Sequence, residues 1–112
     1  MAKAGEIVWV RFPFEGGNAK ENHPALVLDE EDDGRVVLAY GSSKKVDIAN
    51  PKASEVVVSN SADLRVCGLR KPTRFDLGVR ARMYVAPCEK IGELPKSKLR
   101  DLFRAAKGSG LV

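Results

Sequence analysis

Residues 5–14 of this chain read GEIVWVRFPF, and residues 23–28 read HPALVL. In the first stretch apolar residues alternate with others and lead to a Pro-Phe stop; the second apolar run begins at a proline. Alternation of this kind predicts a strand, and the polar segment 15–22 with its two glycines predicts a flexible loop. We therefore expect a strand, a loop and a second strand, with loop residues available to hold a ligand.

Size and composition are those of one globular domain. The chain has 112 residues, of which 44% are hydrophobic and 30% charged. This length suffices for one core but not for two, so we expect a single domain over residues 1–112. No apolar run approaches the roughly 20 residues that span a bilayer, and no apolar signal region follows Met1. We expect a cytoplasmic protein without membrane contact.

The cysteines and the histidine give no metal-binding pattern. Cys67 and Cys88 stand in unrelated contexts, and the chain has one histidine, His23. Two lone cysteines in a chain without a leader are more often reduced than paired. We therefore expect free thiols, no metal site and no cofactor.

The formal net charge of +4 is unevenly distributed along the chain. Acidic residues gather at 29–33, directly before Gly34. The positive charge lies elsewhere, at Lys44, Lys45, Arg70, Lys71, Arg74, Arg80 and Arg82. Because the acidic turn is separate from them, we expect one cationic face that attracts a polyanion.

The remaining pattern is mainly that of strands. An Asp-Gly step at 33–34 predicts a hairpin between the second strand and a third strand at 36–40. A β-branched run at 55–59 predicts a further strand, and weaker patterns at 63–69 and 82–86 indicate two more.

Only the end of the chain has a helical pattern. Leu99, Leu102, Phe103 and Ala106 recur at helical spacing, with Pro95 at the start and Gly108 just past the end. We expect a mainly β fold, a compact antiparallel barrel with a C-terminal α-helix on its side.

The opening stretches resemble those of the MazF/PemK toxin family, whose members begin with a Gly-Asp/Glu-Ile-Val-Trp-Val strand and resume at Arg-Pro-Ala-Leu-Val-Leu. Three later segments are also similar to the family. They are LAYGSSK at 38–44, GLRKPTRFDL at 68–77, which resembles a Pro-Thr-Arg-Phe-Asp-Leu segment of one PemK-like subgroup, and IGELP at 91–95.

The resemblance implies an SH3-like barrel that forms a homodimer and cuts single-stranded RNA without a metal. It implies a short acidic antitoxin as partner in a type II toxin–antitoxin pair. The implied chemistry is attack of a ribose 2′-hydroxyl on its own phosphate. Such a reaction needs a group that takes the 2′ proton and cations or hydrogen-bond donors around the phosphate.

The family pattern directs attention to His23 and Ser42, and the chain departs from it at three points. His23 stands where the family has arginine, and an imidazole exchanges protons near neutral pH, which a guanidinium does not. Ser42 stands where the family has threonine most often. An acid that precedes the later proline in better-known members is missing, because Gly68 and Arg70 stand there.

We assign His23 to proton transfer and Ser42 to orienting the phosphate through its hydroxyl. Gly41 is expected to let RNA approach the backbone closely. Lys44, Lys45, Arg70, Lys71 and Arg74 are the candidate RNA-binding cations. Arg70 and Arg74 are four residues apart and in a strand would share one side.

Each of these residues also has an ordinary structural interpretation. His23 could be a solvated loop residue, Ser42 a turn residue, and the two lysines a solvated pair. Asp76 is expected to pair with Arg74 or Arg80 in a structural role, and Trp9 to lie in the core or a dimer interface.

Two other functions stay open. The first is a catalytically degenerate relative that binds nucleic acid or protein, for which the missing acid and the histidine at position 23 are the evidence. The second is a basic adaptor whose partner is an acidic protein. A shared fold cannot choose among these functions.

Overall fold

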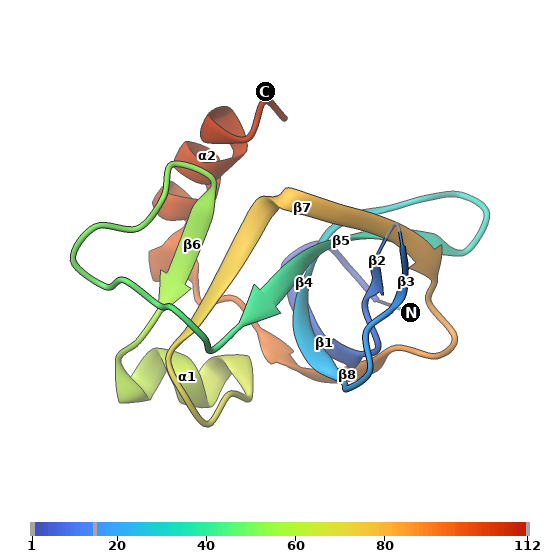
Figure 1. Cartoon of the computed structure of the whole chain (residues 1–112), viewed down its shortest axis with the longest axis horizontal. Coiled ribbons are helices and arrows are strands. Elements are labelled where there is room, and N and C mark those ends of the chain that lie inside the picture. The colour runs from blue at the N-terminus through green and yellow to red at the C-terminus, as the bar shows by residue number, and fades with distance from the viewer. Residues whose placement is uncertain (1, 15, 112) are drawn as a thin grey trace.

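A six-stranded antiparallel sheet dominates the computed structural model, which describes residues 2–14 and 16–111. The sheet has the strand order β6-β7-β5-β4-β1-β8 and curls into a half-barrel (Figure 1). Its strands are β1 (Glu6–Val10), β4 (His23–Glu30), β5 (Arg35–Ser42), β6 (Glu55–Val58), β7 (Thr73–Tyr84) and β8 (Glu89–Glu93). The other elements are the hairpin of β2 (Pro13–Phe14) and β3 (Gly17–Asn18), the helices α1 (Ser61–Cys67) and α2 (Leu99–Gly108), and the 3-10 turn η1 (Lys96–Lys98). The expected mainly β fold with a C-terminal helix is confirmed.

The strand–loop–strand unit and the Asp-Gly hairpin expected near the N-terminus are present. β1 and β4 pair antiparallel, with Val10 opposite His23, at the end where the connecting segment enters. Part of that segment is ordered as the β2–β3 hairpin, whereas Glu15, the first residue of the expected loop, lies outside the described residues. β4 and β5 form the second hairpin, and Gly34 turns it with a φ of 84°, a conformation that glycine adopts without steric cost.

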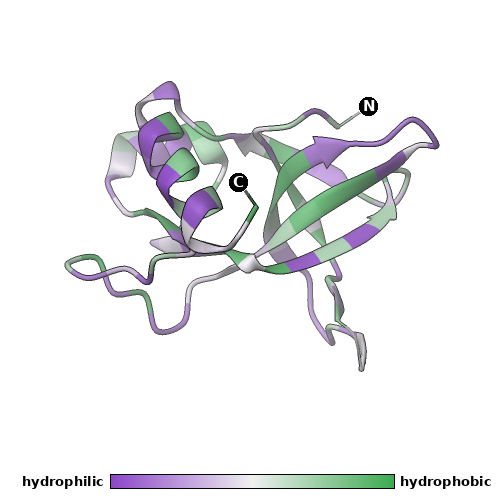
Figure 2. Cartoon of the chain, turned by 90° about the horizontal axis from the view of Figure 1, so that it is seen from above, coloured by the Kyte–Doolittle hydropathy of each residue, from purple (hydrophilic) through white to green (hydrophobic). Residues whose placement is uncertain are grey.

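Alternation along the strands produces two buried clusters on opposite faces of the sheet. One contains Ile7, Leu26 and Phe75 and is covered by apolar residues of the helices, with Leu64, Cys67 and Ala105 all buried. The second lies inside the curl of the sheet and contains Val8, Val10, Phe12, Ala25, Val27, Val36 and Leu38. Figure 2 shows green, apolar segments along several strands of the curled sheet.

The segment 63–69 was expected to be a strand and is the helix α1. Asn60 caps it, because its side chain accepts a hydrogen bond from the Asp63 amide, and Gly68 ends it in the left-handed conformation. Its buried residues Leu64 and Cys67 are three apart, which is a helical spacing. A segment of seven residues with two buried positions is too short for the sequence to distinguish this spacing from strand alternation.

The expected last strand at 82–86 is instead the second half of β7, which ends at Tyr84, and β8 follows as a strand that the sequence pattern missed. Near its middle β7 bends. Ala39 of β5 lies opposite Arg80, but the next residue, Tyr40, lies opposite Asp76, so three residues of β7 are unpaired there. A bulge of this kind redirects neighbouring side chains.

α2 lies beside β6 (Figure 1), and Arg104 connects them by donating to the carbonyls of Ala53 and Glu55. Leu102 and Ala106 pack on the core, whereas Leu99 and Phe103 of the expected apolar stripe are exposed. Gly108 is the last helical residue rather than the one beyond it. None of the described helices has the length and apolar character that crossing a membrane requires.

Candidate active site

His23 is the first residue of β4, and its backbone is fixed on both sides. It pairs with Val10 of β1, and the following Pro24 restricts it to an extended conformation. The side chain is half-buried. Its Nδ1 atom lies 3.5 Å from the hydroxyl oxygen of Tyr40. His23 is therefore part of the sheet rather than of the segment that precedes it.

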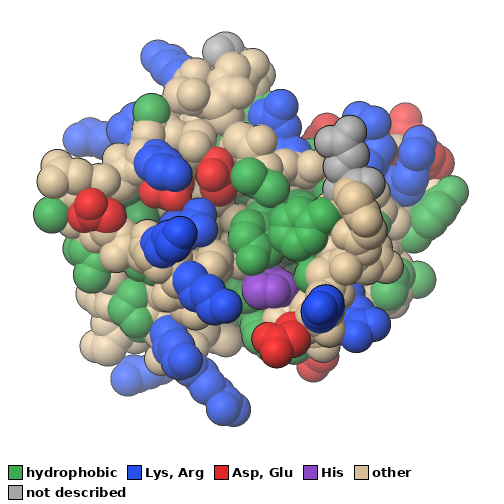
Figure 3. Space-filling view, viewed as in Figure 1, with side chains coloured by type: hydrophobic (Ala, Val, Ile, Leu, Met, Phe, Trp, Pro, Cys, Tyr) green, Lys and Arg blue, Asp and Glu red, His purple; other side chains and the backbone are tan. Residues whose placement is uncertain are grey.

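An aromatic cluster surrounds the imidazole. The ring centroids of His23 and Tyr40 are 5.1 Å apart. The Tyr40 ring makes edge contacts with Phe12 and Phe14, with centroid distances of 5.2 and 5.0 Å. Phe12 is buried, whereas Phe14 on β2 is 37% exposed. Figure 3 shows the imidazole in purple at the edge of a green apolar patch, with Lys and Arg side chains in blue beside it.

Ser42 ends β5 and is close to the cationic segment. It lies opposite Arg74 of β7, and the β4–β5 register brings the His23 and Ser42 ends of the two strands together. Its hydroxyl oxygen accepts a hydrogen bond from the Lys44 amide at 3.1 Å, and the residue is 5% exposed. Ser42 thus stabilises the turn that carries Lys44, which agrees with its structural interpretation as a turn residue.

Gly41 does not provide the open backbone that was expected for RNA. The residue is buried, and a Cβ added there would lie 2.4 Å from the Pro24 carbonyl oxygen and 2.8 Å from the Phe75 ring. The missing side chain instead lets β5 approach β4 closely beside His23.

Arg74 is placed by two intramolecular contacts. Its Nε donates to the Lys44 carbonyl at 2.9 Å, and its Nη1 lies 3.2 Å from a carboxylate oxygen of Glu55. The Glu55 side chain is 4% exposed. Arg74 therefore shapes the turn at residues 43–45, called the lysine turn below. The Glu55 carboxylate offsets much of the charge of Arg74, which weakens this arginine as a phosphate-binding cation.

Arg70 and Lys71 lie in the bend between α1 and β7 and are exposed. Because Arg70 is outside β7, the expected relation that puts it and Arg74 on one side of a strand does not hold. Lys44 and Lys45 are exposed in the turn after β5, where Lys45 adopts a left-handed φ of 55°. Within residues 2–14 and 16–111 these four cations form no ion pair, unlike Arg74.

Asp76 has a structural role, as expected, but its partners are not arginines. Its Oδ1 accepts hydrogen bonds from the Ser54 hydroxyl and the Gly78 amide, both at 2.8 Å. These contacts hold the bulge of β7 opposite Tyr40. Trp9 is 39% exposed, so it does not belong to the core.

The thiols are free. Burial raises the pKa of Cys67 to about 11 and also raises the pKa of Cys88, so both are poor nucleophiles at neutral pH. In the described part of the chain no three His, Cys, Asp or Glu side chains converge as metal ligands would.

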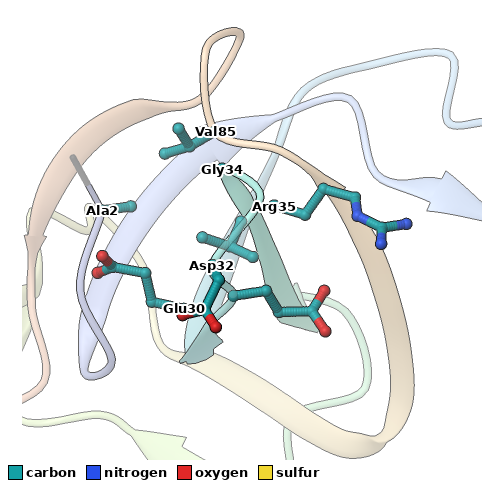
Figure 4. Close-up of a pocket in the computed structure, with 8 residues that line it drawn as sticks. Ala2, Glu30, Asp32, Gly34, Arg35 and Val85 are labelled. Carbon is teal, nitrogen blue, oxygen red and sulfur yellow. The ribbon is translucent and has the colours of Figure 1, made fainter.

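A pocket of about 320 Å³ lies at the other end of the β4–β5 hairpin, at its turn. Figure 4 shows the carboxylates of Glu30 and Asp32 beside it, with Ala2, Arg35 and Val85. Strands of this length separate it from His23 by about 20 Å. Carboxylates repel phosphate, so this pocket is not a site for nucleic acid.

Sequence reasoning missed three residues that shape the site: Tyr40, Phe14 and Glu55. Tyr40 carried a usable signal, because it is two residues before Ser42 and residues two apart in a strand share a face. Glu55 gave none, since its partner Arg74 comes from a distant strand.

The comparisons with known proteins agree with this fold. A family model described as a PemK-like, MazF-like toxin of a type II toxin–antitoxin system matches residues 3–108. No curated protein sequence matches the chain.

Three solved structures share the fold over almost their whole lengths. The chain is similar to the Mycobacterium tuberculosis toxin MazF-mt6, with 20% identity, a TM-score of 0.70 and coverage of 96% of this chain and 97% of that one. An endoribonuclease in complex with its cognate antitoxin from a mycobacterial species has 13% identity and a TM-score of 0.71 over 100% and 98% of the two chains. MazF from Deinococcus radiodurans has 21% identity and a TM-score of 0.63 over 97% and 96%. Because its family model spans nearly the whole chain, the protein belongs to the PemK-like, MazF-like toxins of type II toxin–antitoxin systems, a family of endoribonucleases.

Proposed function

We propose that this toxin-family protein cleaves single-stranded RNA without a metal, with His23 as the proton-transfer group. The observation that carries the proposal is the position of the imidazole. It lies between the aromatic cluster, of which Phe14 is exposed and Tyr40 half-buried, and the turn that carries Lys44 and Lys45 (Figure 3). Aromatic rings stack on unpaired bases and lysines attract phosphates, so this surface suits a single strand.

The proposed reaction uses groups that the chain itself supplies. The ribose 2′-oxygen attacks the adjacent phosphorus while the bond to the 5′-oxygen breaks, which leaves a cyclic phosphate and a 5′-hydroxyl end. His23 accepts the 2′ proton at Nε2 and then gives it to the departing 5′-oxygen. Lys44 and Lys45 stabilise the charge on the phosphate. Arg70 and Lys71 attract phosphates further along the bound RNA.

Ser42 is retained in the proposal as the phosphate-orienting hydroxyl. A hydroxyl has one donor and two acceptor positions, and the Lys44 amide occupies only an acceptor. The donor is left for a phosphate oxygen when the strand binds at this turn.

The proposed partners are a small acidic antitoxin and a second copy of the chain. One structural relative is an endoribonuclease in complex with its cognate antitoxin, and the +4 charge of this chain suits an acidic protein. Trp9, Leu99 and Phe103 are large exposed apolar residues available for a homodimer interface.

A binding module without catalysis is the second candidate function. It is favoured by the ion pair with Glu55, which offsets the charge of Arg74, and by the missing acid at Gly68 and Arg70.

One experiment separates these functions. Purified protein is incubated with a long single-stranded RNA in excess EDTA, and the new ends are mapped, with His23→Ala prepared identically as a control for contaminating nucleases. Discrete cuts with 5′-hydroxyl ends that the variant makes at least about tenfold more slowly support the proposal. Intact RNA that nevertheless binds the folded protein identifies the binding module.

A further inference from the structure

We infer that Tyr40 is a positioning residue for His23. Its hydroxyl oxygen accepts a hydrogen bond from the Nδ1–H group of the imidazole, which leaves Nε2 free to take a proton from RNA. This inference rests on the proposed function for its role in cleavage. The contact itself, between Tyr40 and His23 at 3.5 Å, is a property of the folded chain. Contacts of this length in an unliganded site shorten when substrate binds.

The backbone fixes the distance between the two side chains. His23 is tied to β1 through its pairing with Val10, and β4 and β5 pair with Ala25 opposite Tyr40. Between these two points Gly41 lets the strands approach so closely that a Cβ would collide with the Pro24 carbonyl. The imidazole and the phenol therefore project from neighbouring strands at a separation that backbone contacts determine.

The Tyr40 ring is also held in place. Phe12 and Phe14 contact it with their ring centroids 5.2 and 5.0 Å away, in the edge-to-face arrangements that aromatic pairs prefer. The bulge of β7 lies opposite Tyr40, and the Asp76 carboxylate stabilises this bulge. A ring fixed by two neighbours carries its hydroxyl to one place, which is what a positioning group requires.

The chemistry selects one direction for the hydrogen bond. A neutral imidazole that accepts a proton at Nε2 must carry its own proton at Nδ1, so Nδ1 donates to Tyr40. When Nε2 takes the 2′ proton, Nδ1 still donates to the same oxygen. The added proton then passes from Nε2 to the departing 5′-oxygen, and Tyr40 neither gains nor loses a proton. An acceptor fixes the catalytic tautomer of a histidine base in the same way elsewhere.

The single histidine makes the tautomer directly measurable. In 15N-labelled protein the two imidazole nitrogens of His23 are the only ones present. Their chemical shifts, recorded on the alkaline plateau where they no longer change with pH, identify which nitrogen carries the proton. A free histidine side chain in water favours the proton on Nε2. We expect the proton on Nδ1 in this protein and a shift towards Nε2 in Tyr40→Phe.

Two tyrosines give a matched pair of variants. Tyr40→Phe keeps the ring among Phe12 and Phe14 and removes only the hydroxyl. Tyr84→Phe makes the same change at the end of β7, where the side chain is 62% exposed. We expect Tyr40→Phe to slow RNA cleavage about fivefold, with unchanged thermal unfolding, and Tyr84→Phe to leave both the rate and the tautomer unchanged.

The two measurements distinguish failure of this inference from failure of the proposed function. A proton on Nε2 in the unmodified protein, or a tautomer that Tyr40→Phe does not change, overturns the positioning role whatever the cleavage rate. If the tautomer behaves as expected but His23→Ala cleaves at the original rate, the contact is upheld and the catalytic assignment of His23 fails. A slower Tyr40→Phe with a changed tautomer supports both.

Discussion

The Nη1 atom of Arg74 lies 3.2 Å from the Oε2 atom of Glu55, in an ion pair that is largely closed to water because the Glu55 side chain is 4% exposed. The other Glu55 carboxylate oxygen accepts the Lys52 amide at 2.9 Å. Arg74 in turn donates to the Lys44 carbonyl. This pair therefore connects β6 and β7 to the lysine turn beside the proposed active site.

We expect Glu55→Ala to lower the free energy of unfolding by about 3 kcal/mol, because removing one member of a buried pair leaves the other charge without compensation. Urea denaturation measures the change. Asp33→Ala is the control, since its ion pair with Arg35 is exposed on both sides, and the loss there should be much smaller. Equal losses in the two variants would contradict a structural role for Glu55.

This ion pair also shows where sequence reasoning stops. The strands 5–10 and 23–30 and the Asp-Gly hairpin follow from local alternation and turn chemistry, so they could be predicted. The pairing of Glu55 with Arg74 depends on which strands become neighbours in the sheet, and no local pattern encodes that. Helix α1 was misassigned because seven residues with two buried positions do not define a period.

The site was predicted in a similarly partial way. His23 was proposed because it stands at the family's arginine position before the Pro-Ala-Leu run, and Lys44 and Lys45 were proposed because they are adjacent cations after the third strand. The contact between His23 and Tyr40 was not predicted, because it depends on the register in which β4 pairs with β5. Arg70 was grouped with Arg74 on the assumption of one continuous strand, and the bend before β7 removes that relation.

The central functional prediction concerns His23. We expect His23→Ala to slow RNA cleavage by at least about tenfold, the minimum for loss of a proton-transfer group, without lowering the thermal unfolding temperature greatly, because the side chain is only half-buried. Initial rates on a defined single-stranded oligonucleotide measure the effect. An unchanged rate in a variant that unfolds like the original protein would remove His23 from the mechanism.

The cations should differ in how much they contribute to RNA binding. We expect Lys44→Gln with Lys45→Gln to flatten the dependence of log K on log salt by about 1.4, since each phosphate contact on a single strand accounts for about 0.7. Binding is measured on a 2′-O-methylated oligonucleotide, which cannot undergo 2′-hydroxyl attack.

Two further variants locate the binding surface. Arg70→Gln with Lys71→Gln should flatten the salt dependence of RNA binding if the bound oligonucleotide continues along the bend before β7. Lys96→Gln with Lys107→Gln removes the same charge from η1 and α2 and should leave the slope unchanged. If this control lowers the slope as much as the Lys44 and Lys45 variant, the binding is a response to net charge and not to a defined groove.

Gly41 offers a test of the packing beside the active site. A Cβ at this position would lie 2.4 Å from the Pro24 carbonyl oxygen, a backbone atom that cannot rotate away. We expect Gly41→Ala to lower the free energy of unfolding by about 2 kcal/mol. It should also slow cleavage, because the strands that carry His23 and Tyr40 must move apart. Gly16→Ala is the control, with no described heavy atom within 4 Å of the added carbon. If Gly41→Ala is as stable and as active as the control, the close approach of β4 and β5 does not position the imidazole that we propose as the proton-transfer group.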